Sequence, residues 1–306
     1  MQHATPATVL GDFSGTEFEY FGETTTFLKL NEHFVVRTLD QNGVLEDYAV
    51  KWVFGVEPLQ QYLVEFPGGR LQALPFAWDT RAAENGGQRW FHLYPDEHIA
   101  PGDILHWTGR QQNWNFMCAE CHSTNLVMGY DVKTDSFDTT WSEVSVGCEA
   151  CHGPGSRHVA QARRGAFVNS RFGLGVSLDD QGRAVWTMNP ATGIAERSEP
   201  AMQAPQQSES CGRCHARRAV IAEEYEYGRP LADTHMLSLL DEGLYFADGQ
   251  IQDEVYVYGS FVQSAMYRAG VTCSNCHNPH SLELLTDGEP SNVCAQCHLP
   301  STFAVK

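Results

Sequence analysis

Five copies of the pattern Cys-x-x-Cys-His are the residues of this chain best suited to chemistry. They occupy residues 118–122, 148–152, 211–215, 273–277 and 294–298. Two thiols at this spacing can add to the two vinyl groups of one porphyrin, and the adjacent histidine then offers a nitrogen to the iron. Each copy is therefore interpreted as an attachment site for haem c.

The motifs account for every cysteine, because the chain has ten and five motifs use two each. The sequence therefore predicts five haem c groups. The predicted thioether-forming pairs are Cys118 and Cys121, Cys148 and Cys151, Cys211 and Cys214, Cys273 and Cys276, and Cys294 and Cys297. The predicted proximal iron ligands are His122, His152, His215, His277 and His298.

Three other kinds of site use cysteines at a similar spacing. Structural zinc takes four ligands, so five cysteine pairs would leave one pair over, and zinc does not explain the histidine after every second cysteine. Redox-active dithiols normally occur once, at the head of a βαβ unit. Ten cysteines in 306 residues are few for a disulfide framework. Haem attachment remains the interpretation that explains all five copies.

The side of each iron opposite the motif histidine decides what the haem can do. A second histidine closes the iron and suits it to electron transfer, a methionine raises its potential, and an open position permits small-molecule chemistry. The chain has thirteen histidines, and five lie in the motifs, so eight remain. Eight are enough to give every iron a second imidazole, and we interpret the methionines as packing residues.

Five of the remaining histidines are candidate distal ligands: His280, His158, His235, His106 and His92. His280 lies three residues beyond a motif histidine, too close to return to its own haem, so we expect it to bind a neighbouring one. His158 follows a Gly-Pro-Gly turn that could direct it to an adjacent haem. The other three can equally be hydrogen-bonded core histidines. The remaining three, His3, His33 and His98, are expected at the surface.

The charge of the chain limits its partners. The formal net charge is −18, from 38 acidic and 20 basic residues. Nucleic acids and anionic lipid surfaces attract basic patches, so neither is expected as a partner. Long-range attraction would favour a redox partner protein with a basic surface. An ordinary solvated acidic surface explains the same composition equally well.

The chain contains no stretch long and apolar enough to suggest a membrane span. Its first residues lack the basic and apolar regions of a signal peptide. Haem c is attached outside the cytoplasm, so a periplasmic or otherwise exported location is expected. The missing signal then suggests that the sequence is a piece of a longer protein.

Residues 1–110 contain no cysteine and favour β-structure. Strands are predicted at 33–39 and 48–54, on either side of an Asn-Gly turn, and at 62–66 and 70–74, on either side of Pro-Gly-Gly. A further strand is expected at 89–94. Residues 111–306 are predicted to form the pentahaem cytochrome domain.

Short helices and loops are expected in the second region. A helix is predicted to end at Arg164, before Gly165. Residues 166–207 have little periodicity and are interpreted as an irregular connection. A longer helix is predicted at 253–269, where apolar residues repeat at helical spacing before Gly270.

Two stretches resemble known haem proteins. Residues 147–158, which read Gly-Cys-Glu-Ala-Cys-His-Gly-Pro-Gly-Ser-Arg-His, resemble the cytochrome c554 family. Residues 270–281 and the motif at 294–298 resemble the doubled Cys-x-x-Cys-His pattern of multihaem cytochromes. Residues 90–95, 107–122 and 252–281 are similar to bacterial multihaem cytochromes that are often fused to tetratricopeptide repeats.

These resemblances imply a haem stack wrapped by short helices and loops. With the β-rich N-terminal part, which departs from the cytochrome c554 pattern, the predicted fold class is α+β. They also imply further haem motifs beyond both ends of the sequence and a fused tetratricopeptide-repeat region. In the cytochrome c554 family, histidines at the positions of His158 and His280 are distal ligands, so these two candidates carry over best.

Two functions fit the motifs. The first is electron transfer between a donor and an acceptor through closely spaced haems. The second is a multihaem oxidoreductase that acts on a small nitrogen or sulfur compound at one open haem. The Cys-x-x-Cys-Lys motif of pentahaem nitrite reductases does not occur in the sequence, and no tyrosine can be assigned a catalytic cross-link. Electron transfer is therefore preferred.

Overall fold

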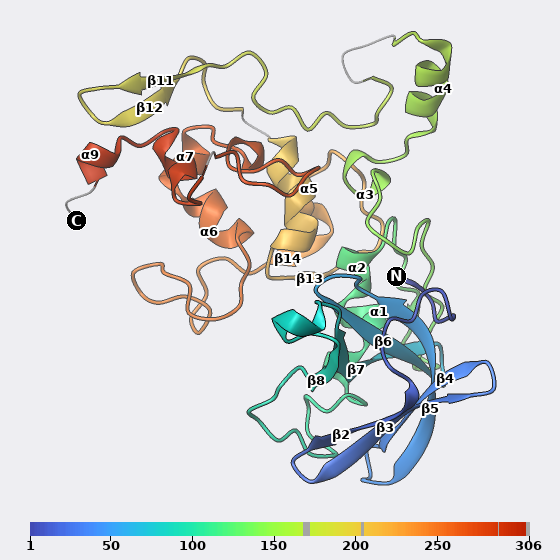
Figure 1. The fold of residues 1–306 in the computed structure, drawn as a ribbon. Coiled ribbons are helices and arrows are strands. Elements are labelled where there is room, and N and C mark those ends of the chain that lie inside the picture. Colours follow the sequence, from blue (N-terminus) through green and yellow to red (C-terminus); the bar gives the residue numbers. More distant parts are fainter. Residues whose placement is uncertain (168–171, 203–204, 287, 304–306) are drawn as a thin grey trace. The chain divides into compact units, whose positions relative to one another are not determined.

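The computed structural model describes residues 1–167, 172–202, 205–286 and 288–303. The chain forms two compact units, Met1–Gly147 and Cys148–Lys306. Figure 1 traces both units from the blue N-terminus to the red C-terminus. The first unit is built around a β-sheet, and the second contains short helices, hairpins and loops. The structure thus has the mixed composition of helix and sheet, with a β-rich N-terminal part, that the sequence predicts.

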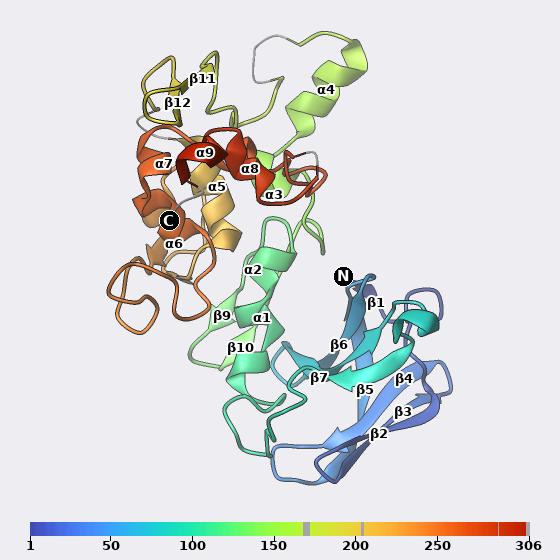
Figure 2. The ribbon, with the colours of Figure 1, turned by 60° about the vertical axis from the view of Figure 1, so that its left-hand side comes forward.

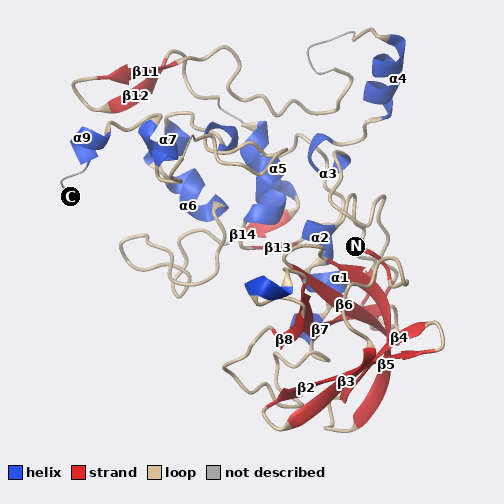
Figure 3. Ribbon diagram, viewed as in Figure 1, coloured by secondary structure: helices blue, strands red, loops and turns tan. Residues whose placement is uncertain are grey.

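The sheet of the first unit is an antiparallel meander, in which each strand pairs with the next along the chain. Figure 3 shows its strands in red. In sheet order they are β2 (Ser14–Tyr20), β3 (Glu23–Leu30), β4 (His33–Leu39), β5 (Leu45–Phe54), β6 (Leu59–Phe66), β7 (Arg70–Asp79) and β8 (Arg89–His92), and β1 (Gln2–His3) pairs with β5. The strands predicted between residues 33 and 94 are confirmed.

Aromatic side chains fill the core of this sheet. The ring of Phe27 on β3 stacks on that of Trp90 on β8, with ring centres 3.5 Å apart and planes within 4°. Phe13 meets the same two rings edge-on, an arrangement that aromatic quadrupoles favour. Because β3 and β8 are far apart in the order of strands, these contacts show that the sheet curls around its own core.

The first Cys-x-x-Cys-His motif belongs to this unit. Cys118 caps the short helix α2 (Ala119–His122), which holds the rest of the motif, and α1 (Trp114–Met117) directly precedes it. The 3-10 helices η1 (Ala83–Asn85) and η2 (Arg110–Gln112) come before α1. The hairpin of β9 (Tyr130–Asp131) and β10 (Ser136–Phe137) follows α2, and Figure 2 shows it beside α1 and α2. The sequence predicts a change of domain near residue 110, whereas the compact unit that contains the first motif extends to Gly147.

The second unit carries the other four motifs. Its helices are α3 (Glu149–His152), α4 (Ser156–Arg164), α5 (Gln206–His215), α6 (Tyr258–Gln263), α7 (Ala265–Arg268), α8 (Asn292–Ala295) and α9 (Pro300–Phe303), with 3-10 helices η3 (Leu231–Asp233) and η4 (Cys273–Asn275). Its two hairpins pair β11 (Trp186–Asn189) with β12 (Ile194–Arg197), and β13 (Arg218–Val220) with β14 (His235–Leu237). No helix in the described part of the chain could cross a membrane.

The structure confirms one helix expected in this unit and corrects two other expectations. Helix α4 ends before Gly165, whose φ of 64° suits a glycine. The single helix predicted at 253–269 is wrong, because Ser264 adopts an extended conformation between α6 and α7 and caps α7 by accepting the Tyr267 N–H. The connection at 166–207 was expected to be irregular, but it contains the β11–β12 hairpin. Its residues 168–171 and 203–204 lie outside the described residues.

Candidate haem sites

Each motif is shaped as a single helical turn. In the motif of α2, the His122 N–H donates to the Cys118 carbonyl at 3.1 Å, and the equivalent bond in α3 joins His152 to Cys148 at 3.0 Å. Residues three and four apart on a helix share one face. Each motif therefore presents both thiols and the imidazole to the same side, as a covalently bound porphyrin requires.

The surroundings of the motifs fit haem. The cysteines of the described residues form no disulfide, and the described residues contain no cluster of three or more His, Cys, Asp or Glu side chains that could hold a metal ion. Apolar side chains next to the motifs are exposed, including Phe116 and Met117 before the first and Leu284 and Leu285 after the fourth. A flat apolar porphyrin would remove such surface from water.

Two asparagines dock the first motif on the sheet. Asn113 caps α1 by accepting the Phe116 N–H at 3.0 Å, and its amide donates to Gln72 on β7 at 3.0 Å. Asn115 is 2% exposed; it accepts the Leu71 N–H at 2.7 Å and donates to the Gly69 carbonyl at 3.1 Å. These bonds explain why the first motif belongs to the β-rich unit.

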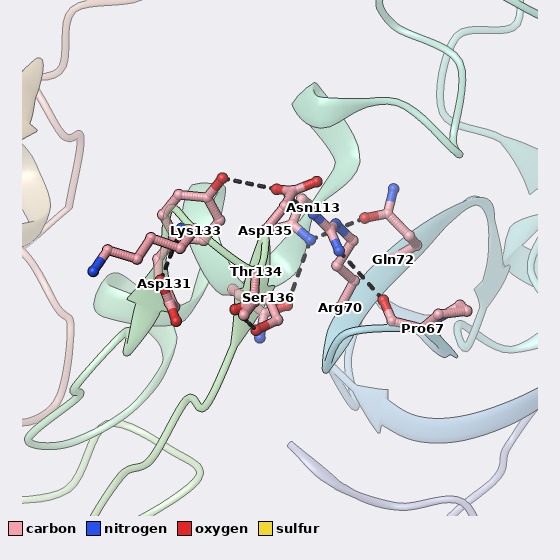
Figure 4. Close-up of polar contacts among 11 residues, drawn as sticks. Pro67, Arg70, Gln72, Asn113, Asp131, Lys133, Thr134, Asp135 and Ser136 are labelled. Carbon is pink, nitrogen blue, oxygen red and sulfur yellow. Dashed lines mark hydrogen bonds and ion pairs between the residues drawn. The ribbon is translucent and has the colours of Figure 1, made fainter.

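A salt bridge extends this docking to the β9–β10 hairpin. Figure 4 shows Arg70, at the start of β7, beside Asp135 in the hairpin turn. The Arg70 guanidinium lies 2.6 Å from the Asp135 carboxylate, which also accepts the Tyr130 hydroxyl at 2.7 Å. The hydrogen bond from Tyr130 and the nearby guanidinium lower the pKa of Asp135. The hairpin after the motif is thus tied to the same strand as the asparagines before it.

Burial changes the titration of the first motif. The pKa of the Cys118 thiol is raised to about 11, chiefly because burial disfavours the thiolate. Burial also lowers the pKa of His122. A neutral imidazole is the form that binds a metal, so the buried setting of His122 favours its role as an iron ligand.

The second and third motifs touch each other directly. On α5, Ser210 donates to the Cys151 carbonyl at 3.2 Å, and Arg213 donates to the Ala150 carbonyl at 3.1 Å. The Arg213 guanidinium also lies over the Tyr225 ring, 4.3 Å from its centre. An arginine inside the third motif thus reaches the backbone of the second.

The third and fourth motifs are in contact through their side chains. Gln207 on α5 accepts the Ser274 N–H at 2.8 Å and donates to the Ser274 hydroxyl at 3.0 Å. Gln207 lies four residues before Cys211 on the same helix, and Ser274 directly follows Cys273, so this contact brings the two motifs together.

The fifth motif is held by the fourth motif and by a hairpin. Gln296 donates to the Asn275 carbonyl, inside the fourth motif, at 3.5 Å, and to the Leu285 carbonyl, in the segment that follows that motif, at 2.9 Å. Backbone pairing joins Ile194 of β12 to His298, and the Ala195 N–H donates to the Cys297 carbonyl at 2.8 Å. Four motifs of the second unit therefore form a connected series in sequence order.

His152 and His280 face one another in the second unit. Their ring centres are 6.1 Å apart, and their planes are parallel within 5°. Two imidazoles whose nitrogens each lie about 2 Å from a shared metal ion have ring centres about 6 Å apart. The His152 Nδ1 atom is buried without a hydrogen-bond partner, and burial, followed by the nearby His280 and His158, lowers the pKa of His152. The arrangement suits one iron between these two rings.

Two further candidate ligands are oriented through Nδ1. On α4, His158 Nδ1 lies 2.8 Å from the Phe172 carbonyl, which requires a proton on Nδ1 and leaves Nε2 as the potential ligand. On β14, His235 is buried, and its Nδ1 lies 2.8 Å from the Thr234 hydroxyl. Both stay predictions as distal ligands, with geometry that suits the role.

The structure places His92 and His106 among the core residues of the β-rich unit. His92 stacks on Tyr20 with ring centres 3.7 Å apart, and its Nδ1 accepts the Tyr94 N–H at 3.0 Å. His106 Nδ1 lies 2.8 Å from the Thr108 hydroxyl, and both histidines line the same cavity. Their surroundings suit structural histidines, and their ligand role stays a prediction.

A pH-dependent stability follows from His92. Burial lowers its pKa from 6.5 to about 4. Between these values the unfolded chain binds a proton that the folded unit does not, so His92 should destabilise the β-rich unit as the pH falls from 6.5 to 4, by up to about 3 kcal/mol. Hydrogen exchange of the β7 and β8 amides in the whole protein would measure this loss.

The His92→Phe variant should lose less stability than the parent protein over that pH range. The matched control, His33→Phe, changes an exposed histidine on the same sheet and should leave the pH dependence as it was. If the parent and His92→Phe lose the same stability between pH 6.5 and pH 4, His92 is not the cause of the pH dependence.

Several residues that organise these sites could not be identified from the sequence. Asp180 and Gln181 lie in the connection interpreted as irregular, yet the Asp180 side chain contacts the start of α5, which carries the third motif, and the Gln181 side chain contacts the fourth motif. Arg213 occupies a variable position inside a motif, where its type carries no prediction. Their roles depend on contacts between distant segments, which local patterns do not reveal.

Two family models match parts of the chain. Residues 104–153 match the model described as cytochrome c554 and c-prime, and residues 265–302 match the model described as the doubled CXXCH motif. No curated protein and no solved structure matches the chain. The two matches include the first, second, fourth and fifth motifs, and they support haem c binding and haem-based electron transfer.

Proposed function

We propose that this chain, a c-type cytochrome with doubled Cys-x-x-Cys-His motifs, transfers electrons through five covalently attached haems, mostly with two histidine ligands each. When bound, a haem accepts and releases one electron at a time. The observation that carries the proposal is the connected series of four motifs in the second unit, whose side chains and backbones touch in sequence order. Short separations between neighbouring haems are what transfer through the protein needs.

Different residues of the chain are proposed to hold the porphyrin and the iron of each haem. The paired thiols fix each porphyrin, and the five motif histidines are the proposed proximal ligands. His280 is the proposed distal ligand opposite His152, on the evidence of their parallel rings. His158 is proposed to serve another iron, because its Nδ1 contact with the Phe172 carbonyl orients the ring for ligation through Nε2. His235 is also proposed as a distal ligand, since it is a buried histidine of the second unit. We propose that the haems form a stack around which the short helices of the second unit are wrapped.

Haem attachment and net charge also suggest where the protein is located and which partner it meets. An exported location, such as the periplasm, is proposed because haem c is attached outside the cytoplasm. The formal charge of −18 would attract a redox partner with a basic surface, and this attraction would weaken as salt is added. A fused tetratricopeptide-repeat region is a further proposal that rests on the resemblance alone.

A second candidate function is a multihaem oxidoreductase with one open iron. The carrier is favoured because three histidines outside the motifs, His280, His158 and His235, have a geometry that suits a second ligand, which would serve three of the five irons. Two of the three, His280 and His158, lie close to the second motif. An oxidoreductase remains the alternative if any haem iron has no second histidine as a ligand.

Mass and spin state together test the proposal. The protein, expressed with a complete haem-attachment system, is expected to gain the mass of five haems and to show low-spin ferric signals in electron paramagnetic resonance. A high-spin fraction that changes on addition of nitrite, hydroxylamine or tetrathionate would favour the oxidoreductase. Polypeptide without added mass would contradict both functions.

A further inference from the structure

Asp180 and Gln181 lie between the second and third motifs in sequence, but they contact the helix that carries the third motif and the fourth motif itself. Both belong to the segment that precedes β11. The guanidinium of Arg197, on β12, donates to the Asp180 carbonyl at 3.3 Å and to the Gln181 carbonyl at 3.1 Å. The backbone of this pair is therefore held from one side while its side chains point to two motifs.

The Asp180 side chain holds the helix that carries the third motif. It is 4% exposed, and its two oxygens accept the Gln206 N–H at 3.1 Å and the Gln207 N–H at 2.7 Å. These are the first two residues of α5, where free N–H groups and the helix dipole favour a carboxylate. The position of Asp180 thus sets where α5 begins.

The Gln181 side chain reaches the fourth motif. Its amide nitrogen donates to the Asn275 side chain at 2.8 Å and to the Thr272 hydroxyl at 3.1 Å. Asn275 lies between the two cysteines of that motif, and Thr272 directly precedes the first. The amide oxygen of Gln181 accepts the Trp186 indole N–H at 3.2 Å. Asp180 and Gln181, which are adjacent in the chain, therefore bind α5, which carries the third motif, and the fourth motif.

Gln207, on α5, links the helix of the third motif directly to the fourth motif. Its two hydrogen bonds to Ser274 involve both the oxygen and the nitrogen of its amide. Gln207 lies about one helical turn before Cys211, and Ser274 directly follows Cys273. Since each of these thiols would be bonded to a porphyrin edge, the Gln207–Ser274 contact brings two attachment points together.

We propose that Asp180, Gln181 and Gln207 are positioning residues that hold the haems of the third and fourth motifs as a strongly coupled pair. The inference rests on the proposed function, because it requires haem at both motifs. A charge added to one member of a close pair raises the free energy of adding a second charge to its neighbour. Unpaired electrons on the two irons should also interact magnetically at short separation.

The test compares the parent protein with Gln207→Met and Gln181→Met. Methionine has a similar length to glutamine but cannot form these hydrogen bonds. Mass measurement first establishes that each protein carries five haems. Electron paramagnetic resonance of the oxidised protein then measures spin coupling, and a potentiometric titration measures how far the two reduction steps of the pair are separated.

In the parent protein we expect a spin-coupled signal and a separation of about tenfold in the reduction equilibrium constant, which is about 59 mV for one electron. Both variants should show more isolated low-spin signals and a smaller separation. The matched control is Gln263→Met, because Gln263 donates only to Gly259 within α6 among its described hydrogen bonds. This control should keep the parent signals.

The assignment to the third and fourth motifs needs one more variant. A protein with Cys294→Ala and Cys297→Ala lacks the attachment site of the fifth motif and should keep the coupled signal. Loss of the signal in that variant, or its persistence in five-haem Gln207→Met and Gln181→Met, would overturn the inference. So would a parent protein with five haems and no coupling, a result that leaves the proposed electron transfer intact. A parent without five haems would instead contradict the proposed function.

Discussion

Replacing His280 with glycine is expected to convert one haem from low spin to high spin. The variant removes the imidazole that lies parallel to His152, with a ring-centre separation of 6.1 Å. An iron with one histidine and an open position is high spin, whereas two histidines give a low-spin iron. Electron paramagnetic resonance should show about one haem in five changing, and the midpoint potential of that haem should rise, since axial ligands act over a range of about 0.8 V.

Adding free imidazole to the His280→Gly variant tests the same prediction in a second way. The imidazole should enter the space left by His280→Gly and restore the low-spin signal, which a general loss of structure would not allow. His33→Gly is the matched control, because His33 is exposed on β4 and should leave all haems low spin. A His280→Gly protein whose spectrum equals that of the parent would remove His280 from the list of ligands.

Asn115→Ala is expected to cost about 1–3 kcal/mol of the stability of the β-rich unit. The change leaves the buried Leu71 N–H without the partner that it has in the native unit, whereas the exposed Gly69 carbonyl can bond to water instead. An unsatisfied buried polar group costs about this amount. Hydrogen exchange of the β7 amides in the whole protein would measure the loss.

The docking role of Asn115 makes a second measurement informative. The first motif should become more accessible in the variant, so the haem-free chain should react faster with an alkylating reagent at Cys118. Asn85→Ala changes an exposed asparagine in η1 and should alter neither quantity. Equal stability of Asn115→Ala and the parent would show that other contacts dock the motif.

The parts of the molecule that follow from local patterns were predictable from the sequence. The Asn-Gly turn and alternating residues predict β4 and β5 because a hairpin is built from neighbours in the chain. The helix that ends at Arg164 is predicted for the same reason, since Gly165 directly follows it. The structure places each of these elements where the sequence predicts it.

The parts that depend on distant contacts were not predictable. Nothing local to His152 indicates that its ring will face that of His280, because the two come from segments on either side of the third motif. The connection at 166–207 has an irregular composition, so its sequence does not predict the contacts that Asp180 and Gln181 make with α5 and η4. The helix predicted at 253–269 failed at Ser264, where a side-chain cap on the next turn outweighed the apolar periodicity.

The two units differ in how much apolar core they contain without haem. The β-rich unit has two clusters of buried apolar side chains, with Trp90 in one and Trp114 in the other. In the described part of the second unit, the cluster of buried residues consists of Ala216, Leu231 and Tyr258. During biogenesis, the sheet can therefore condense on its own, whereas the region after Gly147 should stay loosely collapsed and open to the ligation enzymes until porphyrins supply its interior.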